Sequence, residues 1–118
     1  MTKASLTRAL LLCAAIISTR VLAGETTVSQ LLSNPTAFDG KHVTVAGTAE
    51  SVKPNTSRSG YDYETFNLCQ ESCVNVFTLG HPRVPEGGRM TVNGRFKAVQ
   101  QFGPYTFHDE VDADAGSL

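Results

Sequence analysis

Residues 61–79 read YDYETFNLCQESCVNVFTL and predict a β-hairpin. In its first half, Tyr61, Tyr63, Thr65, Asn67 and Cys69 alternate with Asp62, Glu64, Phe66 and Leu68. This period of two residues is typical of a strand. The second half, residues 74–79, alternates in the same way. Only three residues separate Cys69 from Cys73, which suits a short hairpin loop. We therefore expect two antiparallel strands joined at the cysteines.

Three further strands are predicted around this hairpin, at residues 42–51, 89–96 and 105–111. Gly47 and Gly94 interrupt the first two of these strands, and a glycine inside a strand often marks a bulge or a barrel bend. Polar or glycine- and proline-rich segments separate the strands and predict loops or turns: residues 53–60, 80–88 and 98–104.

A short helix is predicted ahead of the strands. Thr26 and Thr27 can cap residues Val28–Ser33, which place Val28, Leu31 and Leu32 on one side, and Pro35 ends the helix. Five antiparallel strands of this length close into a barrel. The sequence therefore predicts an all-β, five-stranded Greek-key barrel with a short N-terminal helix.

Residues 1–23 have the layout of a signal peptide. Lys3 and Arg8 precede the apolar run of residues 9–18, and small or modest residues before Gly24 suit cleavage after Ala23. The apolar run is shorter than the roughly 20 residues that a membrane-spanning helix needs. We expect a periplasmic or secreted protein with no membrane span after signal removal. The expected division is a signal peptide at 1–23, a helix and linker at 24–37, the barrel at 38–113 and a frayed tail at 114–118.

Removal of the signal would leave an acidic chain. The signal contains three of the 10 basic residues and none of the 11 acidic ones, so the mature chain has 7 basic and 11 acidic residues and a net charge of −4. Sequence-independent binding to nucleic acid depends on neutralising phosphates. The net charge disfavours that function, although local basic patches are compatible with it.

The mature chain keeps two cysteines, Cys69 and Cys73. In an oxidising compartment such a pair usually forms a disulfide, and chain entropy assigns about 2 kcal/mol to a loop of five residues. A thioredoxin-like redox pair would have two intervening residues at the start of a helix. A zinc site built from these thiols with His81 or His108 would not have a standard ligand spacing. We therefore expect a structural disulfide, no metal ion and no cofactor.

Five runs of sequence form one pattern along the chain: FDGKHVTVAGTAESV, YETFNL, VNVFTL, GGRMTVNGRF and GPYTFHDEVDA. The pattern is a V-x-V-x-G strand, a central hairpin, a V-x-G strand and a last strand that ends in an acidic and hydrophobic segment. It resembles the OB-fold domains of the tRNA-anticodon-binding-like type over roughly residues 38–113. The resemblance implies an OB-fold-like barrel and a binding role, but no particular ligand, because such domains bind nucleic acids, sugars or proteins. CQESC departs from the usual Asp/Gly turn of the family.

Two tyrosines are the first candidates for a binding site. Tyr61 and Tyr63 lie on the strand that often forms the OB-fold binding face, where outward-pointing rings would stack on bases or sugars. In the alternative interpretation, the tyrosines only cover the end of the barrel. Lys53, Arg58 and Arg95 are candidates for phosphate or carboxylate contacts beside the rings, or are ordinary surface cations.

The sequence favours a binding module without catalytic activity. No serine, histidine and acid gather in a way that indicates a nucleophile, and the neighbouring Asp109 and Glu110 point to opposite faces of a strand. The first hypothesis is a monomer that binds a protein or an envelope glycan through the tyrosine face. The alternative, implied by the resemblance, is single-stranded nucleic-acid binding. A metal or redox protein is a third hypothesis and requires free thiols at Cys69 and Cys73.

Overall fold

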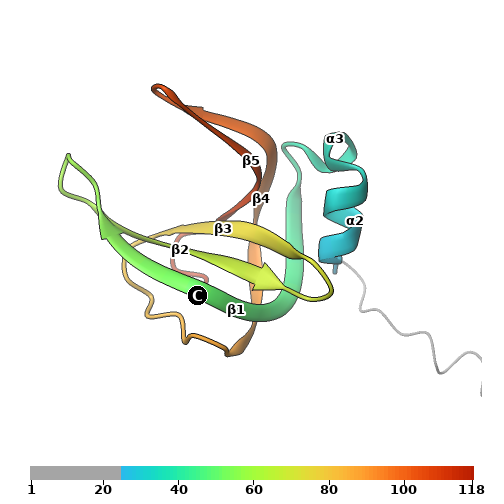
Figure 1. The fold of residues 1–118 in the computed structure, drawn as a ribbon, viewed down its shortest axis with the longest axis horizontal. Coiled ribbons are helices and arrows are strands. Elements are labelled where there is room, and N and C mark those ends of the chain that lie inside the picture. The colour runs from blue at the N-terminus through green and yellow to red at the C-terminus, as the bar shows by residue number, and fades with distance from the viewer. Residues whose placement is uncertain (1–24) are drawn as a thin grey trace, which may run out of the picture.

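The computed structural model describes residues 25–118 and confirms the predicted fold class. The described chain is mostly β: five strands form one closed sheet, and short helices lie on its N-terminal side (Figure 1). The expected signal peptide, residues 1–23, lies outside the described residues. No helix within residues 25–118 has the length and apolar character needed to cross a membrane.

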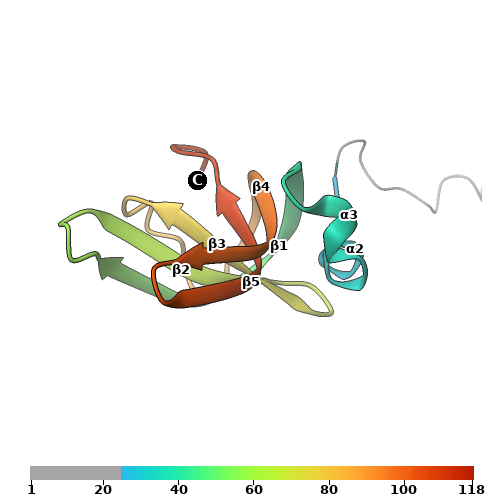
Figure 2. The ribbon, with the colours of Figure 1, turned by 90° about the horizontal axis from the view of Figure 1, so that it is seen from above.

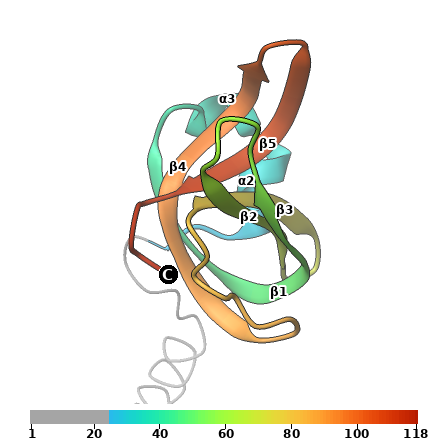
Figure 3. The same ribbon diagram turned by 90° about the vertical axis from the view of Figure 1, so that its left-hand side faces the viewer.

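The strands follow one another around the sheet in the order β1-β2-β3-β5-β4, and β4 closes on β1. Their bounds are β1 (His42–Thr56), β2 (Asp62–Cys69), β3 (Cys73–Leu79), β4 (Arg89–Phe102) and β5 (Tyr105–Ala113). All neighbouring strands are antiparallel except β3 and β5, which run parallel. Figure 3 shows the β4–β5 hairpin rising away from the rest of the sheet.

Two segments that the sequence predicted as loops belong partly to strands. Residues 53–56 extend β1, and residues 98–102 extend β4, so that Gly103 and Pro104 alone form the turn before β5. Backbone pairing with β2 and β5 respectively holds these extensions in strand geometry, although most of their side chains are exposed. The loop prediction was wrong there because polar residues indicate exposed side chains, and they do not show whether the backbone pairs with a neighbouring strand.

A bulge in β1 connects the barrel to its first extension. The register between β1 and β2 shifts between Glu50 and Lys53, and Ser51 has a φ of 56°. The Glu86 carboxylate accepts hydrogen bonds of 2.9 Å from the backbone N–H groups of Val52 and Ser51. These bonds lower the pKa of Glu86. The loop before β4 therefore holds the bulge in place.

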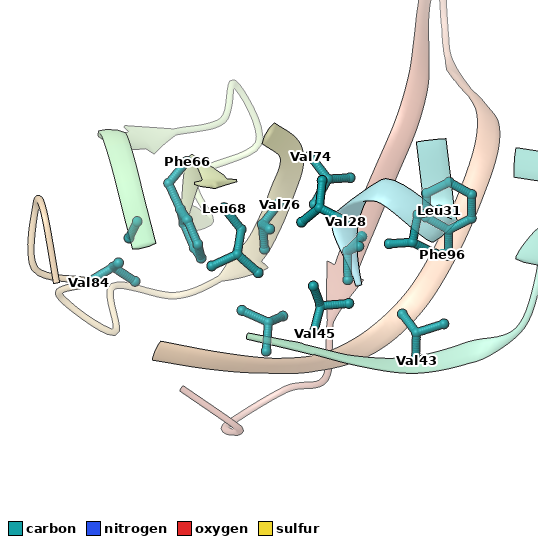
Figure 4. Packing of buried hydrophobic residues seen from close by; sticks show 13 residues of the cluster. Val28, Leu31, Val43, Val45, Phe66, Leu68, Val74, Val76, Val84 and Phe96 are labelled. Carbon is teal, nitrogen blue, oxygen red and sulfur yellow. The ribbon is translucent and has the colours of Figure 1, made fainter. Parts of the chain in front are cut away.

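Helix α2 (Val28–Ser33) has the predicted bounds and caps one end of the core. The Thr27 hydroxyl accepts the Gln30 N–H, and the Gln30 side chain accepts the Thr27 N–H. Pro35 ends α2 and also begins a second short helix, α3 (Pro35–Phe38), because a proline fits the first turn of a helix. Val28 and Leu31 are fully buried and point towards the core residues of the strands (Figure 4).

The core contains apolar side chains from all five strands. Its strand members are Val43, Val45, Ala49, Phe66, Leu68, Val74, Val76, Val92, Phe96 and Val111. Val43 and Val45 on β1 and Val92 and Phe96 on β4 are all buried. The interior of the sheet is therefore filled by side chains.

The predicted disulfide joins β2 and β3. Cys69 and Cys73 are bonded with an S–S distance of 2.06 Å. In the loop between them, the Gln70 side chain accepts the Val28 N–H at 3.1 Å and donates to the Ala46 carbonyl at 2.6 Å. The hairpin loop thus connects α2 to β1 as well as joining its own two strands.

The C-terminal residues return to the barrel. The Asp114 N–H donates to the Asn93 carbonyl at 2.9 Å, and the Asp114 carboxylate lies 2.6 Å from His42 Nε2. Leu118 packs against the hydrophobic core. Residues 114–118, which were expected to be a frayed tail, therefore contact β1, β4 and the core.

Candidate ligand-binding groove

An open groove of about 390 Å³ lies between the β1–β2 and β4–β5 hairpins. Figures 1 and 2 show both hairpin tips at the end of the molecule away from the helices. Five aromatic side chains line the groove: Tyr61, Tyr63, Phe77, Tyr105 and Phe107. The surface is thus formed by the outer face of the sheet, on strands whose opposite face forms the core.

The rings on the β2–β3 side form a continuous series. The centroids of Tyr61 and Tyr63 are 6.1 Å apart, and those of Tyr63 and Phe77 are 5.3 Å apart with the rings stacked. Across the groove, Tyr105 and Phe107 lie on the β4–β5 hairpin, and Tyr105 is 66% exposed. A ligand between the hairpins would meet aromatic surface on both sides.

The groove side chains of β2 and β3 follow from simple alternation. Tyr63 and Thr65 face outward because Glu64 and Phe66 face the interior. β5 breaks this alternation at Asp109, which has a φ of 53°. The resulting turn of the strand allows Phe107 and Glu110, three residues apart, to line the same groove.

Glu110 forms part of the groove wall with its side chain almost fully buried. The residue is 4% exposed, and its Oε2 accepts a hydrogen bond from Asn75 Nδ2 at 3.2 Å. Burial, and then the hydrogen bond and negative charge of Asp112, raise the pKa of Glu110 to about 8 despite the opposing bond from Asn75. Glu110 therefore carries a proton at neutral pH, which is unusual for a carboxyl group.

Glu110 and Asp112 also have unfilled hydrogen-bonding capacity. Among the described residues, the buried oxygens Glu110 Oε1 and Asp112 Oδ1 have no hydrogen-bond partner outside the carboxyl pair itself. A proton shared by the two carboxyl groups would satisfy both atoms in the free protein, and a donor on a ligand would satisfy them in a complex. The groove is thus apolar along its walls and has hydrogen-bonding capacity at the carboxyl pair.

The structure gathers only some of the site residues predicted from the sequence. Tyr61 and Tyr63 line the groove. Lys53 pairs with Thr65, which is a wall residue, and Arg58 lies in the exposed loop between β1 and β2. Arg95 does not line the groove, and its guanidinium donates to the Gly40 carbonyl at 2.5 Å. The three cations therefore do not form a basic wall of the groove.

Sequence reasoning missed Phe77, Tyr105, Phe107 and Glu110 as wall residues. All four come from β3 or β5, which lie next to each other in the sheet although 25 residues separate Leu79 from Tyr105. The available signal was the alternation of Tyr105 and Phe107 along the last strand. That pattern could have indicated the site only together with the parallel pairing of β3 and β5.

A second hollow, of about 320 Å³, lies at Glu64 and His81. His81 Nδ1 is 3.4 Å from Glu64 Oε2, and His81 Nε2 is 3.5 Å from Asp62 Oδ2. The Glu64 carboxylate also accepts the backbone N–H groups of Arg83 and Val84. These contacts fasten the segment after β3 to β2, so we assign this cluster a structural role.

The metal and redox hypothesis is not supported by the structure. It required free thiols at Cys69 and Cys73, and the two sulfur atoms are bonded to each other. Within residues 25–118, no group of three or more His, Cys, Asp or Glu side chains is arranged to hold a metal ion.

Comparisons with known proteins found no match: no protein-family model fits the chain, and no curated protein is similar to it in sequence.

Proposed function

We propose that this chain is a binding module without catalytic activity, exported by its signal peptide to the periplasm or beyond, which acts as a monomer. Its ligand is a protein or another component of the cell envelope, and it binds between the two hairpins. The observation that carries this proposal is the open groove with aromatic rings on both walls. Tyr61, Tyr105 and Phe107 are 48%, 66% and 40% exposed, and apolar surface gathered in this way is typical of an interaction site.

We also propose that the domain is an OB-fold of the tRNA-anticodon-binding-like type. The support is the strand order β1-β2-β3-β5-β4, together with a groove that lies over β2 and β3 and between the β1–β2 and β4–β5 connections. OB-folds bind oligonucleotides and oligosaccharides over the same strands and loops. The position of the groove therefore supports a binding role for it.

Single-stranded nucleic acid is the second candidate ligand. The ring series Tyr61, Tyr63 and Phe77 favours it, because aromatic side chains stack on bases of any sequence. Two features oppose it: no lysine or arginine is among the described residues that line the groove, and the mature chain has a net charge of −4. Binding to phosphates depends on such cations, so we rank this candidate below a protein or envelope component.

The test is a nuclear magnetic resonance titration of ¹⁵N-labelled residues 24–118. Three probes are added separately: a mixture of blocked peptides, soluble cell-wall glycan fragments, and an oligothymidylate at low and moderate salt. We expect saturable shifts of groove amides with the peptides or the glycans, and loss of these shifts when Tyr61 and Tyr63 are replaced by alanine.

The matched control is Val99→Ala, which removes an exposed apolar side chain of β4 that does not line the groove. This variant should keep the shifts. Groove shifts with the oligonucleotide alone, weakening as salt rises, would instead establish the nucleic-acid function. No groove shifts with any probe would contradict the proposed binding site.

A further inference from the structure

The carboxyl pair formed by the wall residue Glu110 and its neighbour Asp112 has no cationic partner within the described chain. Glu110 is paired across the sheet with Asn75 on β3 and Lys97 on β4, and Asp112 with Phe77 and Arg95. The salt bridges among the described residues involve only His42 and His81 as the basic partners. Neither Lys97 nor Arg95 therefore neutralises the pair, and the Arg95 guanidinium donates to the Gly40 carbonyl instead.

The unfilled acceptor atoms select the type of group that can bind there. Glu110 Oε1 and Asp112 Oδ1 are buried and have no hydrogen-bond partner outside the carboxyl pair, and Glu110 belongs to the groove wall. An anion or a hydrogen-bond acceptor would face two carboxyl oxygens. A cation with several N–H donors would fill both positions, and a guanidinium does this best because its planar fork matches carboxylate oxygens.

The walls suit the rest of such a group. Tyr63 and Phe77 form one wall and Phe107 lies on the other, so a flat cation near Glu110 has aromatic surface beside it. Aromatic faces attract cations and stack on guanidinium planes. The groove is open at its rim, where Asn55 and Ser57 add polar contacts, so an extended peptide could pass through it.

We propose that the groove binds an extended peptide segment through one arginine, whose guanidinium lies between the aromatic walls and donates hydrogen bonds to Glu110 and Asp112. This inference rests on the proposed binding function and specifies its ligand. It predicts that the ligand contains a basic residue and disfavours an anionic polymer as the ligand.

Binding of arginine to this pair should release a proton. Glu110 has a pKa of about 8 in the free protein and is protonated at neutral pH. A guanidinium beside it favours the ionised form, so the proton leaves as the ligand binds. The fraction of ionised Glu110 rises about tenfold between pH 7 and pH 9 for a pKa of about 8. Affinity for an arginine peptide should rise by about the same factor, because arginine stays charged throughout this range.

The experiment compares two dye-labelled peptides by fluorescence anisotropy with residues 24–118. Each is a blocked pentapeptide with two phenylalanines around its central residue, which is arginine in one and the neutral analogue citrulline in the other. We expect the arginine peptide to bind more tightly, with a gap that widens about tenfold from pH 7 to pH 9. Calorimetry in buffers of different ionisation enthalpy should show proton release at pH 7 with the arginine peptide only.

Two variants test whether Glu110 causes the preference for arginine over citrulline. Glu110→Gln should remove most of the preference for arginine and its dependence on pH. Glu71→Gln, in the exposed hairpin loop, makes the same change in net charge and should leave both unchanged. The measurements on the wild-type protein decide the question even if the Glu110 variant does not fold.

The outcomes separate this inference from the function on which it rests. Equal binding of the two peptides at pH 9, abolished by Phe77→Ala, would overturn the arginine site and leave the groove as a peptide-binding site. A preference for arginine that survives Glu110→Gln would also overturn the site. Absence of binding to either peptide would overturn the arginine site, and groove shifts with glycans or oligonucleotides in the earlier titration would then identify a different ligand class.

Discussion

The two halves of β4 have different surroundings in the sheet. Residues 89–95 pair with β1 in the barrel, and there Val92 is fully buried. Residues 97–102 pair with β5 alone, and there Val99 is 55% exposed. Both side chains are valines, so the difference in exposure comes from the surrounding sheet. Apolar residues are buried where the sheet closes around a core and remain exposed where only two strands pair.

β1 is divided in the same way. Its first half faces the core with Val43 and Val45, while residues 53–56 lie past the bulge and pair only with β2. A two-stranded ribbon is marginally stable by itself. The hairpin extensions that flank the groove therefore depend on the barrel for their stability, whereas the barrel does not depend on them. Substitutions in the two regions should differ accordingly, and three predictions test this difference.

The largest effect is expected for Gly94→Ala in the barrel. A Cβ at this position would lie 2.8 Å from the Ala113 Cα and closer still to the Asp112 carbonyl oxygen, both of which are backbone atoms of β5. The strands would have to move apart at the junction of β4 with β5. We expect a loss of about 3 kcal/mol or more in the free energy of unfolding, measured by urea denaturation.

The control is Thr91→Ala, which changes an exposed side chain three residues earlier in β4. It should cost much less than Gly94→Ala. Equal stabilities for Gly94→Ala and the wild type would show that β4 and β5 tolerate greater separation, and would weaken the description of the barrel as the rigid region.

A smaller effect is expected for the disulfide. Replacing both Cys69 and Cys73 with serine removes a bridge that closes a five-residue loop at the barrel end of β2 and β3. Chain entropy assigns about 2 kcal/mol to such a loop. The melting temperature should fall by about 10 °C for a domain of this size, with the fold retained. An unchanged melting temperature would mean that the hairpin is held by Gln70 and the core without the bridge.

The sequence predicted the barrel better than the groove, for a physical reason. The core strands show inward valines at every second position, as with Val43 and Val45, and this pattern follows directly from burial. The ends of β1 and β4 lack such a pattern because most of their side chains are exposed. Their strand geometry comes from backbone pairing with a partner, which composition does not record.

A smaller part of the groove was predictable on the same grounds. Tyr61 and Tyr63 were candidates for outward-facing rings because they belong to the alternating set opposite Glu64 and Phe66. Glu110 was not expected, since its position depends on the parallel pairing of β3 with β5 and on the positive φ of Asp109. Both are long-range or backbone features. Its raised pKa depends in turn on burial that only the assembled sheet provides.

The smallest effect on stability is expected for Tyr105→Ala, which should lower affinity for the ligand without weakening the fold. Tyr105 lines the groove and is 66% exposed, so its loss removes little buried area. The free energy of unfolding should change by about 0.5 kcal/mol or less, whereas affinity for the arginine peptide should fall at least about fivefold, or ~1 kcal/mol. Val99→Ala on the same hairpin should match it in melting temperature and keep full affinity. If Tyr105→Ala lowered the melting temperature as much as loss of the disulfide, the hairpin would belong to the stable unit, and the division between a barrel that confers stability and a hairpin that confers recognition would be wrong.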